Sequence, residues 1–145
     1  MKIARLTLVL ALLFPALVGC DLPRDPESTL VKVRGGTLTV GVGGPSGPTD
    51  PSERAALERL ASDVGAEITY HSAELHKLAA ELQDGRIDII AGHLPQKTPF
   101  SKELGLSAPV STTRLGNETV KTVFAVRKGE NGFLQAVETA IGESR

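Results

Sequence analysis

The chain has 145 residues, and its 16 basic and 17 acidic side chains give a formal net charge of −1. This length suits one domain with a core of its own, and the balanced charge argues against a nucleic-acid partner. Trp is absent and aromatic residues make up only 3% of the chain, which disfavours a site that stacks on sugars or nucleobases. A single cysteine excludes an internal disulfide and argues against a thiol active site.

The N-terminus has the pattern of a secretory signal. Lys2 and Arg5 precede an apolar run over residues 6–18, which is too short to span a membrane. The run ends in LVGC, which resembles a bacterial lipobox. Residues 1–19 are therefore predicted to be a lipoprotein signal peptide, with Cys20 as the lipidated, palmitate-bearing first residue of the mature chain. An ordinary signal peptide with a chance cysteine is the alternative. Residues 20–27 are predicted to be a tether, and residues 28–145 the folded domain.

The first elements of the domain alternate between helix and strand. A helical turn is predicted from residue 25 to 34, followed by a strand over Thr37–Val42. A helix then starts at Asp50, whose carboxylate can accept backbone N–H bonds, and Glu53 is expected to complete a capping box. Gly65 ends this helix.

The next segment repeats the order of strand, helix and strand. Ala66–Tyr70 is predicted as a strand, and Ser72 as the cap of a helix with apolar residues at i, i+3, i+4 and i+7, namely Leu75, Leu78, Ala79 and Leu82. Ile87–Ala91 suits a strand that is covered on both faces. Within it, Asp88 is expected to pair with a backbone or basic group rather than act as a general base. Alternating strands and helices predict parallel strands joined by right-handed crossovers.

The C-terminal part of the chain is predicted to reverse direction once. Pro109–Leu115 and Glu118–Val126 are expected to pair antiparallel around Gly116-Asn117, a two-residue hairpin turn. This pairing would add one reversed strand to the parallel sheet. Asn131–Ile141 is predicted as the last helix.

In order and spacing these elements resemble the first lobe of periplasmic solute-binding proteins of the polar amino-acid type, family 3. The residues that carry the resemblance are Gly85–Gly92, Thr98-Pro99, Ser107–Val110 and the FAVRKG segment at 124–129. It implies an α/β fold, type II periplasmic-binding-protein-like: a single three-layer lobe with a mostly parallel sheet plus one antiparallel strand. In that family a second lobe lies between the two strands that here meet at Gly116-Asn117, so the resemblance implies that the second lobe is missing.

Ligands of open α/β sheets bind beyond the carboxyl ends of the strands. The candidate ligand-binding residues at those ends are Ser46, His71, His93, Gln96, Lys97 and Thr98. The arginine that clamps a ligand carboxylate in the family's T-x-x-R pattern is absent after Thr98, and Lys97 or Lys102 would replace it only as a point charge. The expected ligand is a small polar solute, with its identity left open.

Other chemistries have less support in the sequence. Gly41–Gly47 follows a strand as a dinucleotide loop would, but its third glycine is out of register and no acid ends the next strand. His71 and His76 are five residues apart, and no cysteine or nearby acid completes a metal set. Ser107 and Ser111 have no evident His/Asp pair. We therefore expect no catalytic residue, metal or cofactor.

The resemblance implies a non-enzymatic lipoprotein of the cell envelope, with its domain in the periplasm or on the outer side of the cytoplasmic membrane. Such a protein would be linked to ABC-type transport or solute sensing through a permease or sensor. The alternative is a degenerate lobe that serves as an interaction or regulatory module for a membrane partner, or that pairs with itself as a homodimer. A third hypothesis, an accessory lobe of an envelope hydrolase or transglycosylase, rests on the fact that such enzymes can carry similar lobes.

Overall fold

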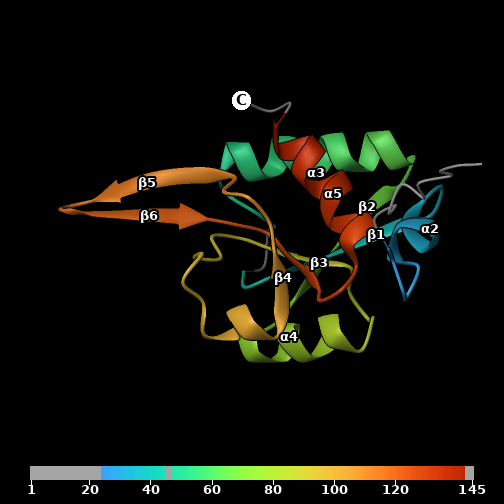
Figure 1. Ribbon diagram of the computed structural model, residues 1–145. Coiled ribbons are helices and arrows are strands. Elements are labelled where there is room, and N and C mark those ends of the chain that lie inside the picture. Colours follow the sequence, from blue (N-terminus) through green and yellow to red (C-terminus); the bar gives the residue numbers. More distant parts are fainter. Residues whose placement is uncertain (1–23, 45–46, 143–145) are drawn as a thin grey trace, which may run out of the picture.

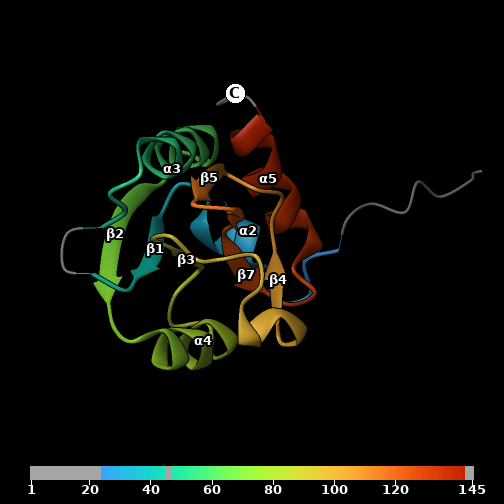
Figure 2. The ribbon, with the colours of Figure 1, turned by 90° about the vertical axis from the view of Figure 1, so that its left-hand side faces the viewer.

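The computed structural model describes residues 24–44 and 47–142. A five-stranded sheet lies at the centre, and its strands in spatial order are β2 (Glu67–Ser72), β1 (Thr37–Val42), β3 (Ile89–Ala91), β7 (Ala125–Arg127) and β4 (Leu104–Leu106). Helices α3 (Pro51–Val64) and α5 (Asn131–Gly142) cover one face, and α4 (Leu75–Gln83) covers the other (Figure 1, Figure 2). This arrangement is the three-layer α/β lobe that the sequence predicts.

The sheet is mostly parallel with one reversed strand. β1 pairs parallel with both β2 and β3, whereas β7 runs antiparallel between β3 and β4. The prediction of one reversed strand is confirmed, but the strand that carries it is β7 alone. β4 was not predicted, because three residues (LGL) give too short a pattern to recognise.

The predicted hairpin forms, and it stands apart from the central sheet. β5 (Ser111–Leu115) and β6 (Glu118–Thr122) pair antiparallel in a two-stranded sheet of their own. Gly116 has φ 62°, the left-handed conformation that a two-residue hairpin turn requires. Figure 1 shows this hairpin projecting from the body of the lobe.

The predicted strand over Glu118–Val126 is divided in two, which corrects the sequence interpretation. Val123 and Phe124 lie between β6 and β7 and are fully buried in opposite core clusters. The Val123 N–H donates to the Leu94 carbonyl (2.9 Å), and the Phe124 N–H donates to Ser107 Oγ (2.9 Å). The chain therefore leaves the hairpin and enters the body at this point, although no Gly or Pro in residues 120–126 marks a break.

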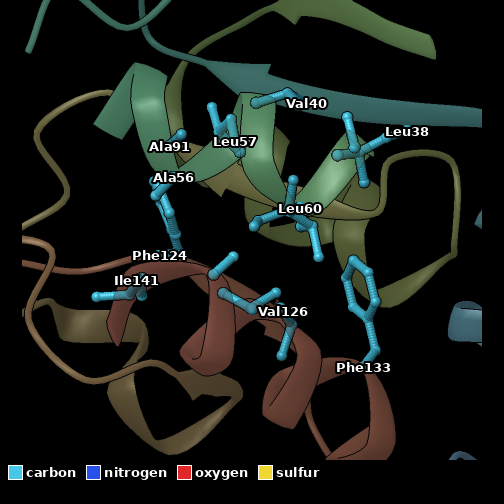
Figure 3. Packing of buried hydrophobic residues seen from close by; sticks show 14 of the residues in the cluster. Leu38, Val40, Ala56, Leu57, Leu60, Ala91, Phe124, Val126, Phe133 and Ile141 are labelled. Atoms are coloured by element: carbon cyan, nitrogen blue, oxygen red, sulfur yellow. The ribbon is translucent and has the colours of Figure 1, made fainter. Parts of the chain in front are cut away.

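The larger core lies between the sheet and the helices α3 and α5. Leu57 and Leu60 of α3 are buried against Leu38, Phe124 and Phe133 (Figure 3). Burying a side chain of this size contributes about 1.5–3 kcal/mol. Leu57 and Leu60 thus turn the apolar side of α3 toward the sheet.

The smaller core lies between the other face of the sheet and α4. Leu78 of α4 packs there with Ile87, and both lie against β1 at Gly41. A Cβ added at Gly41 would be 2.6 Å from Ile87 Cδ1 and 2.8 Å from Leu78 Cδ2, so a larger residue there would displace both buried side chains. Gly41 therefore serves packing and not a dinucleotide loop. Ser72 does not cap α4: it ends β2, and the capping position is Glu74, whose side chain makes no cap bond.

The described N-terminal residues are bound to the lobe. Arg24–Glu27, within the segment predicted as a tether, precede the short helix α2 (Thr29–Val33). Asp25 Oδ1 accepts the N–H of Phe133 (3.1 Å), and the buried Glu130 accepts the N–H groups of Glu27 (2.6 Å) and Thr29 (2.9 Å). The signal peptide and Cys20 lie outside the described residues. Over the described part of the chain, no helix has the length and apolar character needed to span a membrane.

Candidate functional site

Three loops meet at one edge of the sheet. Val42, Ser72 and Ala91 end the parallel strands β1, β2 and β3 at the same level, since Val42 is in register with both of the others. The segments that follow these strands therefore lie side by side. The loop after β3 also reaches the hairpin, because the Gln96 N–H donates to the Lys121 carbonyl (2.9 Å). This edge is where the sequence analysis places the site.

A buried carboxylate holds the loop after β3. Glu53, in the first turn of α3, has no exposed surface. Its Oε1 accepts the N–H groups of Gly92 (3.2 Å) and His93 (3.0 Å). Burial raises the pKa of Glu53, and the N–H groups of His93 and Gly92 only partly offset this effect. The predicted capping box is wrong: Asp50 does cap α3, accepting the N–H of Ser52 (2.7 Å), but Glu53 is used by the distant loop.

The loop has an unusual backbone at the point where Glu53 holds it. His93 adopts φ 62°, a left-handed conformation that costs a non-glycine residue free energy. Its imidazole is mostly exposed, and Nδ1 is 4.0 Å from Glu53 Oε2. Glu53 therefore fixes a loop conformation that the local sequence alone would not favour.

Two of the predicted site residues have structural roles. His71 Nε2 is 2.8 Å from Oε2 of Glu81, a buried acid on α4, so this contact links β2 to α4. Thr98 is buried and caps the 3₁₀ helix η1 (Pro99–Lys102), accepting the N–H of Phe100 (3.4 Å). Each side chain therefore has a polar partner within the protein.

The other candidates lie at the edge or outside the described residues. Gln96 and Lys97 are exposed and lie together on the loop after β3. His93 lies at the start of the same loop. Ser46, the candidate from the loop after β1, falls outside the described residues. His93, Gln96 and Lys97 therefore lie on one loop, whereas His71 lies on β2 with its imidazole against Glu81 of α4.

Gln96 and Lys97 line a cavity that sequence reasoning did not find. Its volume is about 440 Å³, and its lining residues are Pro95, Gln96, Lys97, Glu118, Thr119, Val120 and Lys121. Glu118 and Lys121 come from β6, and the hairpin turn alone gave no sign that β6 would lie along this loop. A cavity of this size is at the small end of the range for sites that take small molecules.

A second, more open hollow lies over β2 and the start of α3. It is lined by Pro48, Thr49, Arg54, Glu58 and Tyr70. Burial and the nearby Glu58 carboxylate raise the pKa of Tyr70. None of the candidate residues that the structure describes lines this hollow.

The base of the hairpin approaches the capping residue of α3. Burial raises the pKa of Asp50, but the N–H of Ser52 and the nearby Ser111 hydroxyl outweigh that effect and lower it overall. The Oγ atom of Ser111 is buried.

Asp88 lies at the opposite edge of the sheet, where it accepts the Thr39 N–H (2.9 Å) and pairs with Lys32 (3.0 Å), as the sequence predicts. Within the described ranges, no three His, Cys, Asp or Glu residues gather as a metal site would need.

One curated relative aligns with most of the lobe. No protein-family model matches the sequence. The chain is 36% identical over 104 residues to the membrane-bound lytic murein transglycosylase F of Vibrio cholerae, a match that covers 65% of this chain. The same match covers 19% of the transglycosylase, so the chain spans about a fifth of the length of that relative.

Solved structures of amino-acid solute-binding proteins share the fold. The arginine-bound form of domain 1 from TmArgBP is 21% identical, with a TM-score of 0.64, and covers 78% of this chain and 94% of that chain. An ancestral cationic amino acid solute binding protein is 14% identical, with a TM-score of 0.68 and coverage of 80% and 93%. The L-cystine solute receptor of Neisseria gonorrhoeae is 14% identical, with a TM-score of 0.63 and coverage of 80% and 90%. The resemblance to family 3 solute-binding proteins is thus confirmed in the fold.

Proposed function

We propose that this chain, which has the fold of one lobe of the amino-acid solute-binding proteins, binds a small polar solute at the carboxyl edge of its sheet without transforming it. Lipid on Cys20 would hold it in the cell envelope, with the lobe in the periplasm or on the outer side of the cytoplasmic membrane. A permease or a sensor protein would receive the solute or its signal.

The observation that carries this proposal is the loop after β3. The buried carboxylate of Glu53 accepts the N–H groups of Gly92 and His93 and so holds the start of this loop. Further along the loop, Gln96 and Lys97 line a cavity. A preformed polar loop at the carboxyl end of parallel strands is where ligands bind in such sheets. The arginine-bound crystal structure of domain 1 from TmArgBP supports the idea that a single lobe of this fold can hold a ligand.

A single lobe is expected to bind weakly. It covers only one side of a solute, so water competes for each hydrogen bond, and the net gain per bond is about 0.5–1.5 kcal/mol. A few such bonds give a dissociation constant of about 1 mM or weaker, near −4 kcal/mol. Tighter binding would require a second copy of the chain or a partner protein to close over the same edge.

Thermal unfolding with a panel of amino acids tests the proposal. With a dissociation constant near 1 mM, 10 mM of a true ligand stabilises the fold by about 1.4 kcal/mol, which raises the melting temperature by several degrees. Sodium chloride at matched ionic strength is the control for salt effects. If no amino acid in the panel raises the melting temperature above this control, solute binding is contradicted.

The transglycosylase relative favours a second candidate function. The chain would act as an accessory or regulatory lobe for a membrane partner that acts on murein. Sedimentation with purified murein sacculi distinguishes the two candidate functions. An accessory lobe of this kind would pellet with the sacculi and would not bind free amino acids. Release of soluble fragments from dye-labelled sacculi by the purified chain would contradict both candidates and show an enzyme.

A further inference from the structure

The segment before α2 is fixed to the lobe from its first described residue. The carbonyl of Arg24 accepts the N–H of Asn131 (2.9 Å), at the start of α5. Asp25 Oδ1 accepts the N–H of Phe133 (3.1 Å), and Asp25 Oδ2 accepts the N–H of Leu30 (2.6 Å). One carboxylate thus joins this segment to both α2 and α5. Arg24 is therefore a fixed point of the lobe and not part of a flexible tether.

A buried acid holds the turn into α2 in a costly conformation. Ser28 has φ 57°, a left-handed backbone that costs a non-glycine residue free energy. The residues on either side of it, Glu27 and Thr29, donate their N–H groups to the carboxylate of Glu130 (2.6 and 2.9 Å). Glu130 is 1% exposed. The fold therefore determines where the chain leaves the lobe toward Cys20.

This exit point lies at the amino edge of the sheet, where β1 and β3 begin. β7 runs antiparallel to β3, so its last residue, Arg127, lies at that edge. Arg127 Nη1 is 3.7 Å from Oε2 of Glu27. Lys32 of α2 pairs with Asp88, the residue before β3 (3.0 Å). Figure 1 shows α2 and the hairpin of β5 and β6 at opposite ends of the lobe.

The chain between Cys20 and this exit point is short. Only residues 21–23 separate Cys20 from Arg24, so an extended chain reaches at most about 14 Å from one Cα to the other. The six residues of β1 place the two edges of the sheet about 17 Å apart, and the hairpin projects further (Figure 1). If the lipid of Cys20 is in a membrane, the lobe cannot turn its hairpin end toward that membrane, because Arg24 would then be out of reach.

The end that the tether can bring to the membrane presents an exposed apolar side chain with basic neighbours. Val31 of α2 is 71% exposed, and the other exposed large apolar side chains among the described residues are Tyr70 and Leu115. Lys32 and Arg34, which follow Val31, are also exposed. An apolar side chain flanked by basic residues suits the boundary between acyl chains and anionic headgroups.

We propose that the amino edge of the lobe, with α2, lies on the membrane that holds the lipid of Cys20, so that the hairpin and the carboxyl edge point away from the bilayer. This inference rests on the lipid anchor of the proposed function and adds to it a contact surface and an orientation. A partner that binds the carboxyl edge or the hairpin then has to extend beyond the bilayer surface by at least the length of β1, about 17 Å.

Energy transfer to the membrane surface tests this orientation. The acylated full-length protein is placed in vesicles of phosphatidylethanolamine and phosphatidylglycerol that carry an acceptor dye on their headgroups. Cys20 is the only natural cysteine and its thiol carries the lipid, so a donor dye attaches to one introduced cysteine. Val31→Cys on α2 and Leu115→Cys on the hairpin are matched positions, because the native side chains are 71% and 63% exposed. We expect transfer from position 31 to exceed that from position 115 by at least about twofold, since the length of β1 lies between them.

A longer tether provides the control for this orientation. An insertion of about 15 Gly and Ser residues between Pro23 and Arg24 spans about 20 Å on average, which is longer than β1. The insertion leaves the bonds of Arg24 and Asp25 in place but allows the lobe to turn over. We expect the difference in transfer between positions 31 and 115 to shrink in the lengthened protein. Circular dichroism of each labelled variant verifies that it is folded.

The outcomes distinguish this inference from the lipid anchor on which it rests. Equal transfer from both positions of the acylated protein, or stronger transfer from position 115, would overturn the orientation while the anchor stands. Mass spectrometry that finds no acyl group on Cys20 would overturn both. Disulfide-linked dimers of the unlabelled Val31→Cys protein in the vesicles would assign the α2 surface to a second copy of the chain, which would also overturn the inference.

Discussion

At the scale of single residues, Glu53 determines the conformation of the loop after β3. Its carboxylate accepts the N–H groups of Gly92 and His93 in a site without solvent. Glu53→Ala would leave both donors unpaired, and we expect it to lower the free energy of unfolding by about 2–4 kcal/mol. Glu53→Gln keeps an acceptor oxygen and should cost less. Urea unfolding measures both, with Glu58→Ala, an exposed acid on the same helix, as the control.

The same residue gives the protein a pH dependence of known sign. Because burial raises the pKa of Glu53 in the folded state, the folded state binds its proton more tightly than the unfolded chain does. The contribution of Glu53 to stability is then full below the usual pKa of a glutamate and declines as the pH rises through the higher folded value. Compared with Glu53→Gln, the wild-type protein should gain stability on acidification through this range. Parallel pH profiles for the two proteins would refute this.

The candidate residues show what a sequence can and cannot predict about a site. The order of the strands predicted that the site lies at the carboxyl edge of the sheet. Gln96 and Lys97 lie at this edge and line a cavity there. The contacts of His71 and Glu53 were not predicted, because their partners, Glu81 and Gly92, lie 10 and 39 residues away. A local pattern such as a capping box contains no information about such contacts.

At the scale of elements, the hairpin of β5 and β6 depends on its turn. Gly116 has a positive φ, which a β-branched residue adopts only at a cost of about 1–2 kcal/mol. Gly116→Val should therefore disorder the hairpin, while Gly116→Asn, which tolerates this conformation, should have a smaller effect. Loss of the cross-strand NOE between Thr113 and Val120, which pair in the hairpin, is the measurement. An intact hairpin in the valine variant would contradict this account.

The N-terminal segment provides a second prediction at this scale. Arg24–Glu27 bind the start of α5 through the carbonyl of Arg24, the carboxylate of Asp25 and the N–H of Glu27. A chain that begins at Ser28 loses these bonds. We expect it to be less stable by about 1–3 kcal/mol than a chain that begins at Arg24. Equal midpoints of urea unfolding would indicate that the segment is only a tether.

The secondary structure followed from the sequence where a pattern was long enough. The helices α3, α4 and α5 and the strand β1 have strong periodicity and were located within a few residues. The division between β6 and β7 was not predictable, because residues 120–126 contain no Gly or Pro and the break at Val123 and Phe124 is imposed by burial in two different cores. β4 is three residues long and depends on its pairing with β7.

At the scale of the whole molecule, the link to the membrane is testable independently of binding. Cys20 and the sequence before it predict a lipid anchor. Mass spectrometry of the membrane fraction should detect a chain that begins at acylated Cys20, and Cys20→Ser should release the protein from the membranes. If the serine variant remains equally bound to membranes, the lipid anchor is excluded as the cause.

The binding of a small polar solute by one lobe of this fold is tested by calorimetric titration of a protein shown to be monomeric by sedimentation. The titrants are the amino acids of the thermal-unfolding panel. We expect saturable binding of at least one of them, with a dissociation constant of about 1 mM or weaker, because half of the ligand stays in contact with water. Micromolar binding by the monomer would contradict the open, single-lobe site, and the absence of saturable heat from every member of the panel would contradict amino-acid binding by the lobe.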